Sequence, residues 1–151
     1  VEKDAPDWRL TIVGYGEDEA YYKQMTQQLG LRNVHFEGLQ NPLPYYQRAS
    51  IFLMSSAFEG WGLTVMEAEQ NKCVSIATDS YAAVHDMIVN GEDGFIVPDH
   101  DVSAYAEKIL TLIQDEQMLE RMGRAARENT KRFTAEKIRG NYETKNKNSV
   151  F

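Results

Sequence analysis

The chain has 151 residues, of which 42% are hydrophobic and 26% are charged, a composition typical of one globular domain with a sizeable core. Its formal net charge of −7 argues against nucleic acid as a partner, because the sequence has no basic stripe to neutralise phosphates. No apolar run reaches the length of a transmembrane segment, and the first residues lack signal-peptide character. The single cysteine, Cys73, cannot form an internal disulfide. We therefore expect a buried Cys73 and a reducing, cytoplasmic location.

Short apolar runs alternate with helical segments along the chain. The pattern predicts strands over residues 10–13, 34–37, 51–54, 74–77 and 95–97. Between them, helices are expected to begin near Glu17, Pro42, Leu63 and Ala82. This alternation requires crossover connections, so it predicts an α/β fold with a parallel sheet covered by helices on both faces.

The last third of the chain reads as helical. Asp101 or Ser103 is a candidate N-cap for a helix in which Tyr105, Ile109 and Leu112 recur at helical spacing, which indicates a core-facing stripe. Further helices are expected over residues 117–130 and 135–142. Residues 1–144 are interpreted as one domain, and residues 145–151 as a flexible tail.

The segment from Ser55 to Ala68 carries the most specific chemistry. Gly60 and Gly62 allow a tight turn after the strand that ends at residue 54, and a helix is expected from Leu63 onward. The N–H groups of Gly62, Leu63 and Thr64 would then lack intrahelical partners at the positive end of the helix dipole, where a diphosphate can bind.

Two glutamates, Glu59 and Glu67, lie eight positions apart across this turn. Carboxylates repel phosphate but accept hydrogen bonds from hydroxyl groups, so the pair suits a ligand with a charged middle and polyhydroxylated ends. Taken as an isolated pair, they would more often be a solvated helix residue (Glu67) and an acidic group near a helix N-terminus (Glu59). Both interpretations stay open at this level.

This motif resembles the Glu-x7-Glu signature of the family-4 retaining glycosyltransferases, with Trp61 in a place often held by another aromatic residue. The resemblance continues over four other segments and covers nearly the whole chain; they are residues 7–16, 29–38, 74–86 and 90–97. It implies a Rossmann-like domain, the C-terminal half of a GT-B enzyme with two such domains. It also implies transfer of a sugar from a nucleoside diphosphate sugar to an acceptor hydroxyl, in a setting such as bacterial polysaccharide biosynthesis.

The resemblance also implies roles for individual residues. Glu59 would face the donor sugar as the catalytic residue, Glu67 would bind the ribose hydroxyls, and backbone N–H groups at 62–64 would hold the diphosphate. Tyr81 is a further candidate, because it follows a strand on the side where open parallel sheets bind ligands. The complete set of expected donor-binding residues is Glu67, Gly60, Trp61, Gly62, Leu63, Thr64, Gly14, Tyr15, Gly16, Gly38, Leu39 and Tyr81.

Several positions depart from the family pattern. A first strand and helix that precede the position of Trp8 in the family are missing here, and with them basic residues for the diphosphate. Lys72 and Val74 stand where relatives usually have Gly and Pro, which implies an altered helix end. Ala82 and Ala83 replace paired glycines, so close backbone approach to the donor is less expected there.

Partners and cofactors follow from the same resemblance. An acceptor glycan or lipid-linked sugar would bind through an N-terminal domain, so the isolated chain is expected to be inactive. No metal or other cofactor is expected: His35, His85 and His100 share no metal-ligand spacing. In a full-length protein, peripheral association with the inner membrane face is a further expectation.

Two other functions remain open. The chain is also consistent with a nucleotide-sugar binding module that has no turnover of its own. An epimerase or phosphorylase of the same architecture is the third candidate, because a fold does not fix its chemistry. No lysine lies in a setting suited to the pyridoxal cofactor of a phosphorylase.

Overall fold

A computed structural model describes residues 1–56 and 61–133 of the chain. The strands are β1 (Leu10–Val13), β2 (Val34–Gly38), β3 (Ile51–Met54), β4 (Val74–Thr78) and β5 (Gly94–Val97). The helices are α1 (Glu19–Gln28), α2 (Leu43–Tyr46), α3 (Leu63–Gln70), α4 (Val84–Met87), α5 (Val102–Gln114) and α6 (Glu116–Thr130), followed by the 3₁₀ turn η1 (Lys131–Phe133). The expected alternation of strands and helices is confirmed. The helix expected over 135–142 and the tail at 145–151 lie outside the described residues.

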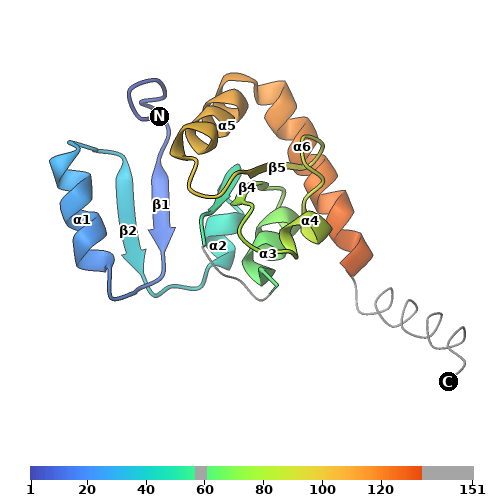
Figure 1. The fold of residues 1–151 in the computed structure, drawn as a ribbon, viewed down its shortest axis with the longest axis horizontal. Coiled ribbons are helices and arrows are strands. Elements are labelled where there is room, and N and C mark those ends of the chain that lie inside the picture. The colour runs from blue at the N-terminus through green and yellow to red at the C-terminus, as the bar shows by residue number, and fades with distance from the viewer. Residues whose placement is uncertain (57–60, 134–151) are drawn as a thin grey trace, which may run out of the picture.

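All strand pairs are parallel, but they form two sheets rather than one. β1 pairs with β2, and β4 pairs with both β3 and β5. Figure 1 shows the β1–α1–β2 unit standing apart from the layers around β3, β4 and β5. The architecture is a Rossmann-like α/β fold, and a break lies in the sheet between β1 and β3.

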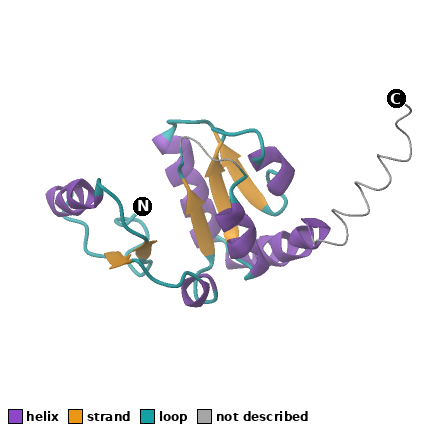
Figure 2. Ribbon diagram, turned by 90° about the horizontal axis from the view of Figure 1, so that it is seen from below, coloured by secondary structure: helices purple, strands orange, loops and turns teal. Residues whose placement is uncertain are grey.

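Period-two alternation in the larger sheet sends side chains to two separate cores. Met54 and Ala77 point to one face, where they pack with Val65 of α3 and Val84 of α4. The opposite face is apolar too. Its core contains Val74, Ile76 and Val97 from the strands, Leu112 from α5 and Met122 from α6. Helices therefore cover both faces of this sheet, as Figure 2 also shows, and β4 is buried along its whole length.

The helix boundaries follow local capping chemistry. Asp101, rather than Ser103, caps α5 by accepting a hydrogen bond from the backbone N–H of Ala104 at 2.8 Å. Asp115 caps α6 in the same way through Met118 at 2.8 Å. These side chains replace missing backbone partners in the first turn.

The C-terminal end of α3 keeps a conformation typical of glycine although no glycine is present. Lys72 has φ +68°, and the N–H of Cys73 donates to the carbonyl of Ala68 at 3.1 Å. This left-handed residue after the helix is the usual way to satisfy the last carbonyl groups. The expected alteration at Lys72 is therefore a change of side chain, while the backbone keeps the conformation that glycine favours.

Candidate functional site

The start of α3 lies at the carboxyl end of β3, the edge at which open parallel sheets bind ligands. Gly62 is its N-cap residue with φ +81°, and among the described residues no side chain caps the helix. The side chain of Leu63 is 63% exposed and that of Trp61 is 43% exposed. Because the first backbone N–H groups of a helix have no intrahelical partner, this uncapped start is chemically suited to an anion.

The packing around Gly62 leaves no room for a side chain. A Cβ atom at this position would lie 2.9 Å from Met87 Cε and 2.9 Å from the Tyr81 hydroxyl oxygen. Tyr81 itself is buried, in the core that contains Val65 and Val84. The expected ligand residue Tyr81 thus lies against the turn before α3 and supports the start of this helix.

Glu67 lies one turn into α3 with an exposed side chain. Its Oε2 atom accepts a hydrogen bond from the Tyr46 hydroxyl at 3.5 Å, the long end of the range for such a bond. Burial, with a smaller contribution from the Glu67 carboxylate, raises the pKa of Tyr46 to about 12. Tyr46 therefore stays protonated near neutral pH and remains a donor to Glu67. No sequence pattern predicted this pair, because α2 and α3 come into contact only in the tertiary structure.

The two glycine turns predicted from the sequence come together at the ends of β1 and β2. The N–H of Gly14 donates to the carbonyl of Gly38 at 2.8 Å. Both residues need glycine's freedom, with φ of +133° and +66°. Tyr15 and Leu39 extend from these turns with 77% and 75% exposure. Gly16 accepts from the N–H of Glu19 at 3.2 Å and so leads the chain into α1.

The expected catalytic residue, Glu59, and its neighbour Gly60 lie outside the described residues. Their position relative to Glu67 therefore stays a prediction. Within the described ranges, the expected residues form two groups, one at the carboxyl ends of β1 and β2 and one around the start of α3. Glu59 and Gly60, which lie between β3 and Trp61 in the sequence, are the remaining expected members of the group around the start of α3.

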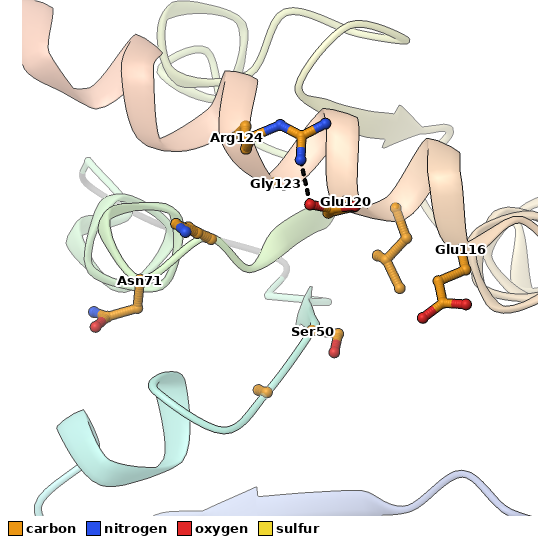
Figure 3. Close-up of a pocket in the computed structure, with 9 residues that line it drawn as sticks. Ser50, Asn71, Glu116, Glu120, Gly123 and Arg124 are labelled. Atoms are coloured by element: carbon orange, nitrogen blue, oxygen red, sulfur yellow. Dashed lines mark hydrogen bonds and ion pairs between the residues drawn. The ribbon is translucent and has the colours of Figure 1, made fainter.

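The larger of two described surface pockets lies at the opposite edge of the sheet. It has a volume of about 290 Å³, and Figure 3 shows Ser50 and Asn71 on one side with Glu120 and Arg124 on α6. Ser50 and Lys72, which precede β3 and β4, also line it, so it is at the amino ends of the strands. An exposed ion pair joins Glu120 and Arg124. None of the expected donor-binding residues contributes to this pocket.

A second pocket of about 240 Å³ lies at the carboxyl ends of β4 and β5. It contains a pair that sequence reasoning missed: His85 Nε2 lies 2.8 Å from Asp79 Oδ1, and both side chains are about half exposed. Asp79 directly follows β4, which was the available signal for a polar group at this edge. The remaining lining residues are Asn90, Ile96, Val97 and Pro98.

Cys73 is buried, as predicted. Its thiol donates to the carbonyl of Tyr46 at 3.3 Å, and burial raises its pKa to about 11. A thiol held in its protonated form is a poor nucleophile. Cys73 thus links α3 and β4 to α2 as a structural residue.

Residues 1–56 and 61–133 lack two larger features. No set of three or more His, Cys, Asp and Glu side chains there is placed to hold a metal ion. None of the helices in residues 1–56 and 61–133 combines the length and apolar character needed to cross a membrane.

Comparison with known proteins assigns this fold to a class. The chain superimposes on a mutant of Staphylococcus aureus TarM, crystallised with fondaparinux, alpha-GlcNAc-glycerol and UDP, with a TM-score of 0.88 and 25% identity. The match covers 95% of this chain and 30% of TarM. The Rossmann-like domain is thus of the C-terminal domain type of GT-B glycosyltransferases.

The sequence profile of the family described as glycosyl transferases group 1 matches residues 1–129, and the chain belongs to this family. One relative is an exopolysaccharide phosphotransferase of Streptomyces coelicolor, 35% identical over 138 residues, which are 89% of this chain and 15% of the relative. Another is the capsular polysaccharide biosynthesis glycosyltransferase CapM of Staphylococcus aureus, 34% identical over 124 residues, 79% of this chain and 32% of CapM. The chain thus spans under a third of either relative's length.

Proposed function

We propose that this chain is the donor-binding domain of a retaining, family-4-type glycosyltransferase, which transfers a sugar from a nucleoside diphosphate sugar to an acceptor hydroxyl. The uncapped start of α3 carries the proposal. Gly62 places the free N–H groups of this helix at the carboxyl edge of the sheet, beside exposed Leu63 and Trp61. Aligned N–H dipoles of this kind stabilise a diphosphate as it departs from the sugar.

Glu67 and Glu59 have different roles in the proposed site. Glu67 accepts hydrogen bonds from ribose hydroxyls, and its carboxylate is already oriented by Tyr46. Glu59 lies next to the donor sugar and stabilises the positive charge that develops on the sugar ring during transfer. The exposed turns at Gly14 and Gly38, with Tyr15, Gly16 and Leu39, flank the sugar and nucleobase. Support for retention of the anomeric configuration comes from TarM, whose mutant was crystallised with alpha-GlcNAc-glycerol and UDP.

The acceptor would bind to another part of a longer protein. A glycan or lipid-linked sugar would bind an N-terminal domain, and transfer would occur in the cleft between the two domains. The chain alone would therefore bind donor without turnover, in the cytoplasm or at the inner membrane face. The match to CapM supports a role in assembling a surface polysaccharide. The proposed reaction needs no metal or organic cofactor.

A nucleotide-sugar binding module without turnover is the second candidate. It is favoured by the small share of each relative that this chain spans. The donor site would be the same in both cases. Sugar transfer by the full-length protein would support the glycosyltransferase. Nucleotide-sugar binding without transfer would support the binding module.

Backbone NMR on the ¹⁵N-labelled chain tests the diphosphate site. UDP, GDP and ADP are added in turn, with inorganic phosphate as a control for nonspecific anion binding. We expect one diphosphate to shift the amide signals of Leu63 and Thr64. The helix starts at Ala104 and Met118 are internal controls, because Asp101 and Asp115 cap them. Binding that shifts only residues remote from α3, or no binding of any nucleotide, would refute the site.

A further inference from the structure

The segment that follows α6 contacts the turn that begins α3, although the two are far apart in the sequence. Phe133 is the last residue of η1. Its ring lies edge-to-face with that of Trp61, the residue before the N-cap of α3, with 6.3 Å between the ring centres and 82° between the planes. Aromatic pairs at separations of about 4.5–7 Å in this arrangement are favourable. The end of α6 thus reaches the start of the candidate site.

The indole of Trp61 is held from two directions. Its Nε1–H donates to the sulfur of Met66 at 3.3 Å, within α3 itself. The ring of Phe133 contacts it from η1. Met66 and Phe133 are both partly buried against the core that contains Met87. Trp61 is therefore connected to that core although its own side chain is exposed, and Phe133 supplies the connection from outside α3.

Arg132 fixes the position of Phe133. Its guanidinium carbon lies 4.6 Å from the centre of the Phe133 ring, within the range of a cation–π contact. The same guanidinium donates to the carbonyls of Asp86 and Met87, at 3.5 Å for Met87. These are the last two residues of α4, and the last carbonyl groups of a helix have no intrahelical partner. Arg132 satisfies both groups, so η1 is anchored on α4.

Met87 provides a second connection between α6 and the turn. Its carbonyl also accepts from the Asn129 side-chain amide at 2.7 Å, so residues of α6 and η1 hold its backbone. Its side chain is fully buried and lies against Gly62, where a Cβ atom would be 2.9 Å from the Met87 Cε atom. The end of α6 thus supports Trp61 through Phe133 and supports Gly62 through Met87.

The first turn of α3 lacks the support that the longer helices have. α5 and α6 are held at their starts by Asp101 and Asp115, whose carboxylates accept from backbone N–H groups. Among the described residues, no side chain does this for α3. The contacts of Trp61 and Met87 take the place of a cap, because they fix the turn and still leave its N–H groups open to a ligand.

We propose that Phe133 is a positioning residue for the donor diphosphate, because it holds Trp61 and thereby fixes the direction of the first free N–H groups of α3. This inference rests on the proposed function of that helix start. N–H groups that already point toward an anion bind it without an ordering cost at the moment of binding. Phe133 acts through Trp61 and does not itself touch the ligand.

A purely structural role for Phe133 is the alternative, since a partly buried ring contributes to stability in any case. Phe95 of β5 is a matched control. It is also partly buried, in the core on the other face of the sheet, and it also has a cation over its ring, with Lys108 Nζ 5.5 Å from the centre. Phe95→Leu therefore removes a comparable ring without removing a contact to Trp61.

NMR without any ligand tests the contact with Trp61. The chain has two tryptophans, so the indole N–H signal of Trp8 is an internal control for that of Trp61. Phe133→Leu should shift the Trp61 signal and leave that of Trp8 in place. The amide order parameters of residues 61–63 should fall from about 0.85, typical of rigid backbone, toward about 0.6. Phe95→Leu should change neither. An unmoved Trp61 signal and unchanged order parameters in folded Phe133→Leu would overturn the proposal.

Arg132→Gln is a second variant, in case Phe133→Leu does not fold. It keeps the ring in the core but removes the guanidinium that holds it. It should shift the Trp61 indole signal in the same direction as Phe133→Leu, by a smaller amount. If Phe133→Leu is unfolded, an unmoved Trp61 signal in Arg132→Gln would overturn the proposal.

Calorimetry with UDP, GDP and ADP then tests the effect on the ligand. Phe133→Leu should weaken binding of the nucleotide that wild type binds by about 2- to 10-fold, the range expected for one aromatic pair. Phe133→Tyr keeps the ring and should restore the affinity. In a Trp61→Leu background, Phe133→Leu should cause no further loss, because it acts through Trp61. Fully additive losses would overturn this route. Absence of binding by wild type would count against the proposed function, whereas an unmoved Trp61 signal counts against Phe133.

Discussion

The hydroxyl of Tyr46 donates a hydrogen bond to the carboxylate of Glu67 across 3.5 Å and so connects α2 to the helix that opens the candidate site. The bond leaves the other carboxylate oxygen of Glu67 available to a ligand. Glu67→Ala should therefore weaken nucleoside diphosphate binding by about 1–3 kcal/mol, if this carboxylate binds ribose hydroxyls. Calorimetry with UDP, or with whichever nucleotide binds, measures the change.

Two variants control this result. Glu107→Ala removes an exposed carboxylate from α5 and should leave affinity unchanged, which excludes a general effect of net charge. Tyr46→Phe keeps the ring but deletes the donor, so its loss of affinity should be smaller than that of Glu67→Ala. Unaltered affinity in Glu67→Ala would contradict the assigned role.

Glu59 is expected to act on the sugar rather than on the nucleotide. In the full-length enzyme, Glu59→Gln should reduce the rate of sugar transfer by far more than it reduces nucleotide affinity, because the carboxylate is needed where charge develops. Transfer assays measure the rate of sugar transfer, and calorimetry on the same protein measures nucleotide affinity. Equal losses of transfer rate and nucleotide affinity would mean that Glu59 binds the donor in the ground state and has no special role in the transfer step.

Gly62 should be intolerant of any side chain for two separable reasons. Its φ of +81° disfavours other residues, and a Cβ would collide with Met87 and Tyr81 at 2.9 Å. Gly91 has nearly the same φ, +84°, but open space around the Cβ position. Gly91→Ala thus measures the backbone cost alone, about 1–2 kcal/mol.

We expect Gly62→Ala to destabilise the chain clearly more than Gly91→Ala in urea unfolding. Met87→Ala in the Gly62→Ala background removes one of the two collisions and should recover part of the difference. If the two glycine variants are equally stable, the contacts beneath the start of α3 do not constrain this turn.

Those elements that depend on local sequence were predictable. Each strand of the larger sheet is a short apolar run whose side chains pack in the core, and Asp101 caps α5 through a residue three positions away. The start of α3 followed from Gly62, since glycine next to an apolar helical pattern is itself a local signal. The glycine turns at Gly14 and Gly38 were recognised on the same grounds.

What the sequence could not show depends on distant segments. Tyr46 lies on α2 and Glu67 on α3, with β3 between them in the sequence, and no spacing rule links the two residues. Asp79 and His85 pair only because α4 turns back over the end of β4. The break between β1 and β3 was missed as well, because periodicity identifies strands but does not say which strands are neighbours.

Buried Glu69 on α3 should make folding stability depend on pH. The side chain is fully buried, and burial raises its pKa to about 8 from an ordinary value of 4.5, with the Ser75 hydroxyl opposing the rise and the Asp93 carboxylate adding to it. Burial raises the pKa of Asp93 too. Between pH 4.5 and about 8, the folded protein holds a proton on Glu69 that the unfolded chain has released. The contribution of Glu69 to stability is therefore greatest below pH 4.5, falls as pH rises, and is flat above about pH 8.

Urea unfolding of wild type and Glu69→Gln at pH 5, 7 and 9 measures this contribution. Gln keeps the shape of a protonated Glu, so the variant should gain stability relative to wild type as pH increases. Exposed Glu107→Gln is the matched control and should show no such trend. The difference in free energy of unfolding between wild type and Glu69→Gln could instead be the same at pH 5 and pH 9. Glu69 would then not titrate in the folded protein over this range. Its carboxylate would be stabilised by contacts stronger than the cost of its burial.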